Sequence, residues 1–215
     1  MSRGLGDVYK RQANIVANRD KRLAATVLYS GSEFKGKVTS IQAGQKVWNQ
    51  QAGSYDYITG MSLGDKDENE LLIRGFDGPS EDKNITNTGF YLKKFVSTSS
   101  DAGLSAVKAS NYWPIFRYAE ILLNTAEAGF ELGKPQAIDY INAIREDAGF
   151  GPNSLVSLTF EDIIQERKVE LAFEGHRYFD LKRWRLSEQI INGVKYHGLY
   201  PYCLLYTSPS PRDTR

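Results

Sequence analysis

Three glutamates near the end of the chain have the residue type and the spacing that acid–base chemistry could use. They are Glu166, Glu170 and Glu174, and intervals of four residues place them on one face of a helix. Glycoside hydrolysis needs two carboxyl groups roughly 5 to 9.5 Å apart across the substrate, usually from different elements. One helix face offers nothing opposite, and four basic residues lie within reach: Arg167, Lys168, Arg177 and Arg183. We therefore predict ion pairs and helix-end capping, no catalytic residue, and a protein that is not an enzyme.

The other reactive residue types form no recognisable site. His176 and His197 are the only histidines, and their spacing matches no metal cluster. We expect a hydrogen bond between His176 and Asp180, four residues later. The acidic run at 65–70 could attract calcium, but it lacks the glycine and ligand spacing of an EF-hand loop, so a solvated loop is favoured. No nucleophile elbow, phosphate loop or dinucleotide fingerprint occurs, and we predict no metal site and no cofactor.

Aromatic and amide side chains gather in a short segment of the first half of the chain. Within ten residues the sequence carries Trp48, Asn49, Gln50, Gln51, Tyr55, Asp56 and Tyr57. Sugar rings stack their C–H faces on flat aromatic surfaces, and their hydroxyls need polar partners. Trp48, Asn49, Tyr55 and Tyr57 are therefore the candidate ligand-binding residues. The simpler alternative is that these aromatic side chains only anchor a long loop, because they bury large areas in any setting.

The bulk composition is that of a globular protein. The 215 residues are 41% hydrophobic and 25% charged, enough for one domain with a real core or for two small ones. The formal net charge is +1, so no basic field indicates a nucleic-acid partner. No apolar run reaches the roughly 18 residues that a membrane-spanning helix needs.

The chain divides into an irregular part and a helical part. Glycines and Asn, Asp or Ser clusters interrupt residues 13–110 every few positions, which predicts loops with brief strands or single helical turns. Residues 111–202 have helical periodicity. Residues 1–12 and 203–215 resemble translated adaptor remnants, and the second of these segments contains Cys203, the only cysteine. We predict that both ends are non-native, and we exclude them from reasoning about the fold.

Apolar spacing places the helices of the second part. The first is expected from Pro114 to about Leu132, and the second opens at Pro135. The apolar face of the second should hold Ile138, Ile141, Ala143 and Ile144. A third helix should run from Thr159, in an approximate capping box, to Gly175, and a shorter one should follow over 178–184. Trp113 and Trp184 are expected in the core between these helices.

Four motifs, which follow one another along the chain in the order that the family has, resemble the SusD/RagB family. Residues 117–128 read RYAEILLNTAEA, and residues 137–145 read AIDYINAIR. Residues 164–184 read IQERKVELAFEGHRYFDLKRW, which is the sharpest of the matches. Upstream, residues 20–23 read DKRL where family members usually have D-P-R-L, so Lys21 departs from the pattern.

The resemblance implies more than the residues do. It implies a mainly α fold of tetratricopeptide-like helical pairs with a long loop-rich region, truncated here at the amino terminus. It implies binding of glycans or other nutrients without cleavage. It also implies a surface lipoprotein of the outer membrane, held by an amino-terminal lipid anchor absent from this fragment. The implied partner is a SusC-like TonB-dependent transporter.

Two alternatives to that function remain. A generic tetratricopeptide-like interaction module would show the helical pair again at an interval of about 34 residues, and no clean second copy is present. A glycoside hydrolase is disfavoured by the carboxylate geometry. Association with a SusC-like transporter would separate nutrient capture from the first alternative, and a polysaccharide cleavage assay would separate it from the second.

Overall fold

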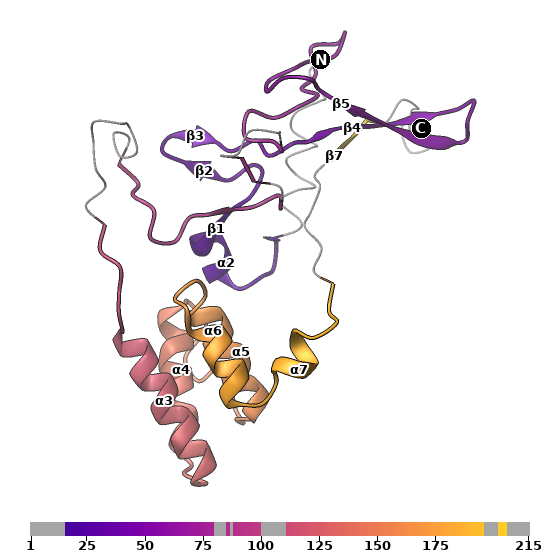
Figure 1. The fold of residues 1–215 in the computed structure, drawn as a ribbon. Helices are drawn as coiled ribbons and strands as arrows, with labels where there is room; N and C mark the ends of the chain where they lie inside the picture. Colours follow the sequence, from indigo (N-terminus) through magenta and orange to yellow (C-terminus); the bar gives the residue numbers. More distant parts are fainter. Residues whose placement is uncertain (1–15, 80–84, 87, 100–110, 196–201, 206–215) are drawn as a thin grey trace, which may run out of the picture. The chain divides into compact units, whose positions relative to one another are not determined.

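The chain forms two compact units (Figure 1). The computed structural model describes residues 16–79, 85–86, 88–99, 111–195 and 202–205. The helical unit combines residues 20–26 with residues 109–195. The strand unit contains the remainder, namely residues 1–19, 27–108 and 196–215. Residues 20–26 thus belong with the helices, although their sequence lies in the segment predicted to be irregular.

Six helices make up the described part of the helical unit. They are α2 (Lys21–Thr26), α3 (Tyr118–Glu131), α4 (Ala137–Asp147), α5 (Phe160–Glu170), α6 (His176–Arg183) and α7 (Ser187–Ile190). Helix α3 packs against both α4 and α5, and α3 and α4 lie side by side in Figure 1. Residues 132–136 join α3 to α4, so the helical pair predicted from the apolar spacing is confirmed.

The core of this unit lies among α3, α4, α5 and the turn after α5. Six apolar residues are buried there in one cluster: Leu123, Ala126, Ile141, Ile144, Ile163 and Leu171. Gly129 lets α3 approach α4 closely, because a Cβ at this position would lie 3.2 Å from the Cβ of Ala137. The structure also confirms the capping box of α5. The Thr159 side chain accepts from the Asp162 N–H at 3.2 Å, and the Asp162 carboxylate accepts from the Thr159 N–H at 2.9 Å.

Two expected helix boundaries were wrong. Helix α3 begins at Tyr118 because Arg117 is extended, with φ −147°, and residues 111–117 are not helical. Helix α5 ends at Glu170, and the backbone then turns through Phe173 and Gly175 at positive φ. Glycine adopts that conformation without strain, so Gly175 suits the turn directly before α6.

The predicted apolar face of α4 needs one correction. Ile141 and Ile144 are buried, but Ala143 is exposed and Asn142 takes an inward position. The hydrogen bonds of the Asn142 amide explain why α4 turns Asn142, and not Ala143, toward the interior. The amide donates to the Leu155 carbonyl oxygen at 3.0 Å and accepts from the Leu155 N–H at 2.9 Å, so it satisfies both backbone groups of a residue in the loop between α4 and α5.

The strand unit consists of short antiparallel pairs and one small sheet. Strand β1 (Val27–Leu28) pairs with β6 (Tyr91–Leu92), and β2 (Glu33–Phe34) pairs with β3 (Lys37–Val38). In the sheet, β4 (Gly44–Asn49) lies between antiparallel β5 (Ser54–Thr59) and parallel β7 (Tyr202–Leu205) (Figure 1). Cys203–Leu205 therefore pair with β4, and the assignment of residues 203–215 as non-native stays a prediction.

Residues 40–43 run through the centre of the strand unit just before β4. Ile41 and Ala43 are almost fully buried, and the backbone of residues 75–78 lies against them. The Gly75 N–H donates to the Gln42 carbonyl oxygen at 2.9 Å. A Cβ on Gly75 would collide with the Ser40 carbonyl oxygen, so this turn requires glycine for close approach. Among the described residues of both units, no helix is long and apolar enough to cross a membrane.

The core assignment is testable with two leucines of one helix, one in its interior and one at its C-cap. Leu123 is 0% exposed, whereas Leu132, which caps α3, is 72% exposed. Leu123→Ala should lower the free energy of unfolding by roughly 2 to 5 kcal/mol, because it removes buried methyl groups and leaves a cavity. The matched control Leu132→Ala should change it by less than about 0.5 kcal/mol. Urea unfolding followed by far-ultraviolet circular dichroism measures both, and equal effects would contradict the core.

Candidate functional site

The hairpin of β4 and β5 sorts its side chains onto two faces. Trp48 pairs with Tyr55 across the strands, and Lys46 pairs with Tyr57. Side chains alternate along a strand, so residues two apart share a face. Lys46, Trp48, Tyr55 and Tyr57 therefore lie together on one side of the hairpin, which we call the aromatic face.

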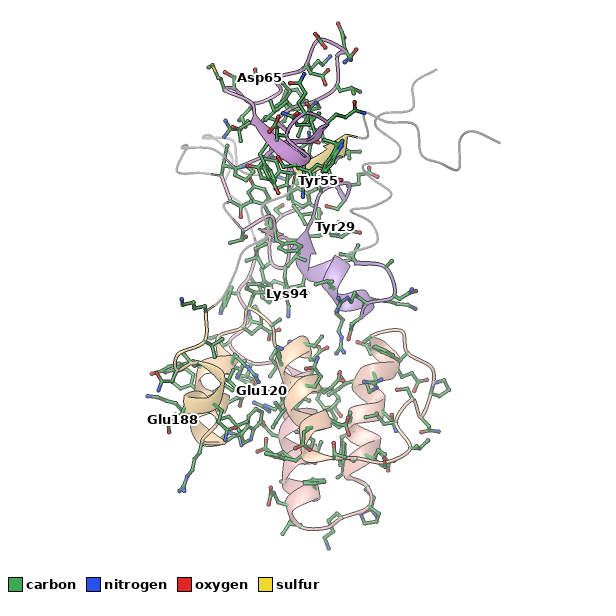
Figure 2. All side chains as sticks on the ribbon, turned by 90° about the vertical axis from the view of Figure 1, so that its right-hand side faces the viewer. Tyr29, Tyr55, Asp65, Lys94, Glu120 and Glu188 are labelled. Atoms are coloured by element: carbon green, nitrogen blue, oxygen red, sulfur yellow. The ribbon has the colours of Figure 1, made fainter. Side chains whose placement is uncertain are left out.

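Ring contacts hold the aromatic face together. The Trp48 and Tyr55 rings meet edge to face with centroids 4.9 Å apart, and Tyr57 meets Tyr202 of β7 in the same way at 4.9 Å. Trp48 is 37% exposed, Tyr55 38% and Tyr57 57%. Three of the four predicted ligand-binding residues are thus brought together and remain accessible (Figure 2 labels Tyr55). The sequence analysis missed Lys46 and Tyr202, although the interval of two residues between Lys46 and Trp48 could have indicated the first.

The structure separates Asn49 from the other predicted residues. By strand alternation its side chain lies on the opposite face, where its Nδ2 donates to Asp56 at 2.9 Å. Its Oδ1 accepts from the N–H groups of Gln51 at 3.0 Å and Ala52 at 3.1 Å. These bonds shape the turn between the strands in the way that asparagine side chains commonly do. The geometry favours a structural role for Asn49 and leaves the sugar-stacking hypothesis to the three aromatic residues.

The acidic run at 65–70 lies against that opposite face. Gln45 of β4 is almost completely buried and donates to the Asp67 carboxylate at 2.9 Å. The other Asp67 oxygen accepts from the N–H groups of Asn69 and Leu71, both at 2.9 Å. Burial raises the pKa of Asp67, but these hydrogen bonds outweigh it and hold the pKa below its ordinary value. This carboxylate therefore organises its own loop.

The carboxylates of α5 are held by arginines from other elements. The Glu166 side chain is 3% exposed and pairs with Arg22 Nη1 of α2 at 2.6 Å and with Arg145 Nη1 of α4 at 3.3 Å. Arg22 Nη1 also lies 2.8 Å from Glu170. Burial lowers the pKa of Arg22, but hydrogen bonds to Asp20, Glu166 and Glu170 raise it by more than burial lowers it. The pKa therefore lies above its ordinary value, and the guanidinium stays charged.

A second arginine completes the row. Arg117, directly before α3, contacts Glu170 at 2.6 Å through Nη1 and Glu174 at 2.9 Å through Nε. Its Nη2 also donates to the Glu170 backbone carbonyl oxygen at 2.7 Å. Against the effect of burial, Glu174 and Glu170 raise the pKa of Arg117. The predicted structural use of the three glutamates is confirmed, but the predicted partners Arg167 and Arg183 bind elsewhere.

Those two arginines tie α6 to α5 and α3. Arg167 binds both oxygens of Asp180 at 3.1 and 3.0 Å, and both side chains are almost fully buried. Arg183 pairs with Asp180 at 3.0 Å and with Glu127 of α3. Glu127 also accepts from the Trp184 indole N–H at 2.8 Å. Burial raises the pKa of Glu127, but Arg183 and Trp184 together hold it below its ordinary value.

The remaining predicted positions are partly corrected. Asp180 is bound by arginines, and His176 Nε2 lies 3.7 Å from Glu120 of α3, so the expected His176–Asp180 bond was wrong (Figure 2 labels Glu120). Trp184 is half-buried against Phe160, with ring centroids 5.8 Å apart. Trp113 is 59% exposed and is not a core residue. His197 lies outside the described residues.

Comparisons with known proteins agree with one another. A model of the SusD family matches residues 6–202. A SusD-like protein of Formosa agariphila is 37% identical over 120 residues, which cover 49% of this chain and 24% of that protein. A SusD-like protein of Bacteroides ovatus is 32% identical over 84 residues, 36% of this chain and 15% of that protein.

A solved structure gives the same answer for the fold. The crystal structure of a SusD-like carbohydrate-binding protein from Bacteroides fragilis has a TM-score of 0.60 at 25% identity, over 84% of this chain and 31% of that one. The predicted fold class, mainly α and SusD-like, is confirmed. The chain spans about a quarter of the length of the Formosa relative and about a third of the solved one.

The arginine–glutamate row predicts a large stability cost for losing one buried charge. Glu166→Gln would remove the carboxylate that Arg145 contacts and one of the three carboxylates that Arg22 contacts, and breaking a buried ion pair costs roughly 3 to 5 kcal/mol. The control Glu131→Gln changes an exposed residue of α3 and should cost less than about 0.5 kcal/mol. Chemical unfolding of the full chain compares the two. A near-neutral Glu166→Gln would show that the row does not hold the unit together.

Proposed function

The chain belongs to the SusD family, and from that membership we propose that the complete protein captures glycans, or other nutrients, at the cell surface without cleaving them. The aromatic face of the β4–β5 hairpin is the observation that carries this proposal for the chain itself. The solved relative from Bacteroides fragilis is described as carbohydrate-binding, which supports the same ligand class.

The chemistry of the aromatic face suits a sugar ring. Trp48, Tyr55 and Tyr57 present ring surface to solvent instead of burying it in the core. A pyranose can stack its apolar C–H face on such a surface, while its hydroxyls exchange hydrogen bonds with the tyrosine hydroxyls. Edge-to-face packing of Trp48 on Tyr55 fixes both rings before a ligand arrives, which lowers the entropy lost on binding.

The way in which the carboxylates are used supports a binding role without catalysis. The Glu166 and Glu174 side chains are each 3% exposed, and both are held by arginines. A hydrolase needs a carboxylic acid that can protonate a leaving group and a second carboxyl group across the substrate. Carboxylates neutralised by guanidinium groups inside a helical unit are suited to neither task, so we propose that the protein is not an enzyme.

The partner that we propose is a SusC-like TonB-dependent transporter. In this proposal the protein is a lipoprotein exposed on the outer membrane, and it passes its ligand to the transporter on which it docks. The formal net charge of +1 offers no field for nucleic acid.

Glycan affinity should depend on Trp48 and not on a more exposed tryptophan elsewhere, Trp113. Trp48→Ala should weaken binding about tenfold or more, a loss of about 1.4 kcal/mol, because the stacking surface is removed. Trp113→Ala, which removes an exposed indole from the helical unit, is the matched control and should bind normally. Titration calorimetry against a polysaccharide panel measures both, with melting curves to verify folding. Unchanged affinity in a folded Trp48→Ala protein would remove the aromatic face from the proposal.

The transporter should copurify with the complete, lipid-anchored protein. Affinity capture from solubilised outer membranes is expected to yield a SusC-like transporter in a stoichiometric complex that survives washing. An anchored lipoprotein from another family is the control for membrane carry-over. Recovery of unrelated soluble proteins instead would favour a general helical interaction module.

A further inference from the structure

Charge is divided between the two faces of the hairpin. On the aromatic face, the ammonium group of Lys46 lies beside the rings. Two carboxylates, Asp56 and Asp67, belong to the other face, where they accept hydrogen bonds from Asn49 and Gln45 respectively. The aromatic face therefore presents a positive charge, and the hairpin backbone separates that charge from these two carboxylates.

Lys46 is held over aromatic rings and not by an acidic side chain. Its Nζ lies 4.4 Å from the ring centroid of Tyr55 and 5.2 Å from that of Tyr57. Within the part of the chain that the structure describes, no ion pair involves Lys46. A cation above a ring face is attracted weakly compared with a cation beside a carboxylate. The rings therefore hold the Lys46 ammonium group on the aromatic face. Because no carboxylate among the described residues is paired with it there, it can still bind an anion.

We propose, resting on the proposed function of the same face, that the ligand is an acidic glycan. Its carboxylate or sulfate group lies at Lys46, and its sugar rings stack on Trp48 and Tyr55. The positive charge of Lys46 on this face matches an acid group on the sugar, whereas the Asn49 amide is used in the turn on the other face. Lys46 therefore selects for charge, and the aromatic residues supply affinity for the ring.

The test uses glycans that differ only in charge. The full chain is titrated with oligogalacturonides and with their methyl esters, and separately with sulfated carrageenan oligosaccharides and their desulfated forms. The acidic member of at least one pair should bind about tenfold more tightly at low salt, and added salt should reduce that preference because it screens exposed charges. Whether the carboxylate or the sulfate pair shows it identifies the acid group.

Variants assign the preference to one side chain. Lys46→Met should remove the difference within the pair, and Lys46→Arg should keep it because the positive charge is retained. Lys94→Met is the control, since Lys94 also lies over a ring, 5.3 Å from the centroid of Phe95, outside the hairpin (Figure 2 labels Lys94).

The outcomes of these titrations distinguish selection for acidic glycans from the proposed glycan capture on which it rests. Equal, Trp48-dependent binding of acidic and neutral partners would overturn the selection by charge and leave glycan capture standing. A charge preference that survives in Lys46→Met would also overturn the role of Lys46. Failure of every glycan to bind a folded chain would overturn both.

Discussion

The helical unit depends on one electrostatic constraint, which is that the carboxylates of α5 must be matched by guanidinium groups where water is largely excluded. Glu166 and Glu174 could not remain charged in that setting without partners, because an unpaired buried charge costs several kcal/mol. Arg22, Arg117 and Arg145 provide the partners. Each comes from a different segment, so neutralising one row of charges also fixes where α2, the start of α3 and α4 lie against α5. Leu123, Ile141 and Ile163 then fill the space between the helices.

The same constraint explains how this row of glutamates is used in the structure. A carboxylate that accepts from two guanidinium groups, as Glu166 does, is committed to holding the elements that carry them. The proposed recognition surface lies instead in the strand unit, where the two-residue period of β4 and β5 separates structural from accessible side chains. Gln45 and Asn49 on one face organise the neighbouring loop and the turn. Trp48 and Tyr55 on the other face remain partly open to solvent. One short hairpin thus carries both its own support and the surface that we propose for the ligand.

Sequence reasoning predicted what depends on local spacing and missed what depends on distant contacts. Helical periodicity gave α3, α4 and α5, and the Thr159–Asp162 capping box was predicted correctly because it involves neighbouring residues. The start of α3 was missed, since Arg117 is held extended before that helix and binds glutamates more than 50 residues away. No local pattern could pair Arg22 with Glu166. The face of Asn49, in contrast, could have been predicted once residues 44–59 were recognised as a hairpin, because alternation alone places it opposite Trp48.

The three tryptophans allow one measurement to compare the proposed ligand surface with the charged scaffold. Trp48 lies on the aromatic face, whereas the Trp184 indole N–H is bonded to Glu127 within the arginine–carboxylate network. Their indole N–H resonances can be followed by NMR while an oligosaccharide that binds the protein is added, with Trp48→Phe to assign the signal. The account predicts that the Trp48 resonance shifts with saturation and that the Trp184 resonance stays in place. A shift of Trp184 with Trp48 unchanged would place the ligand at the carboxylates and contradict the account.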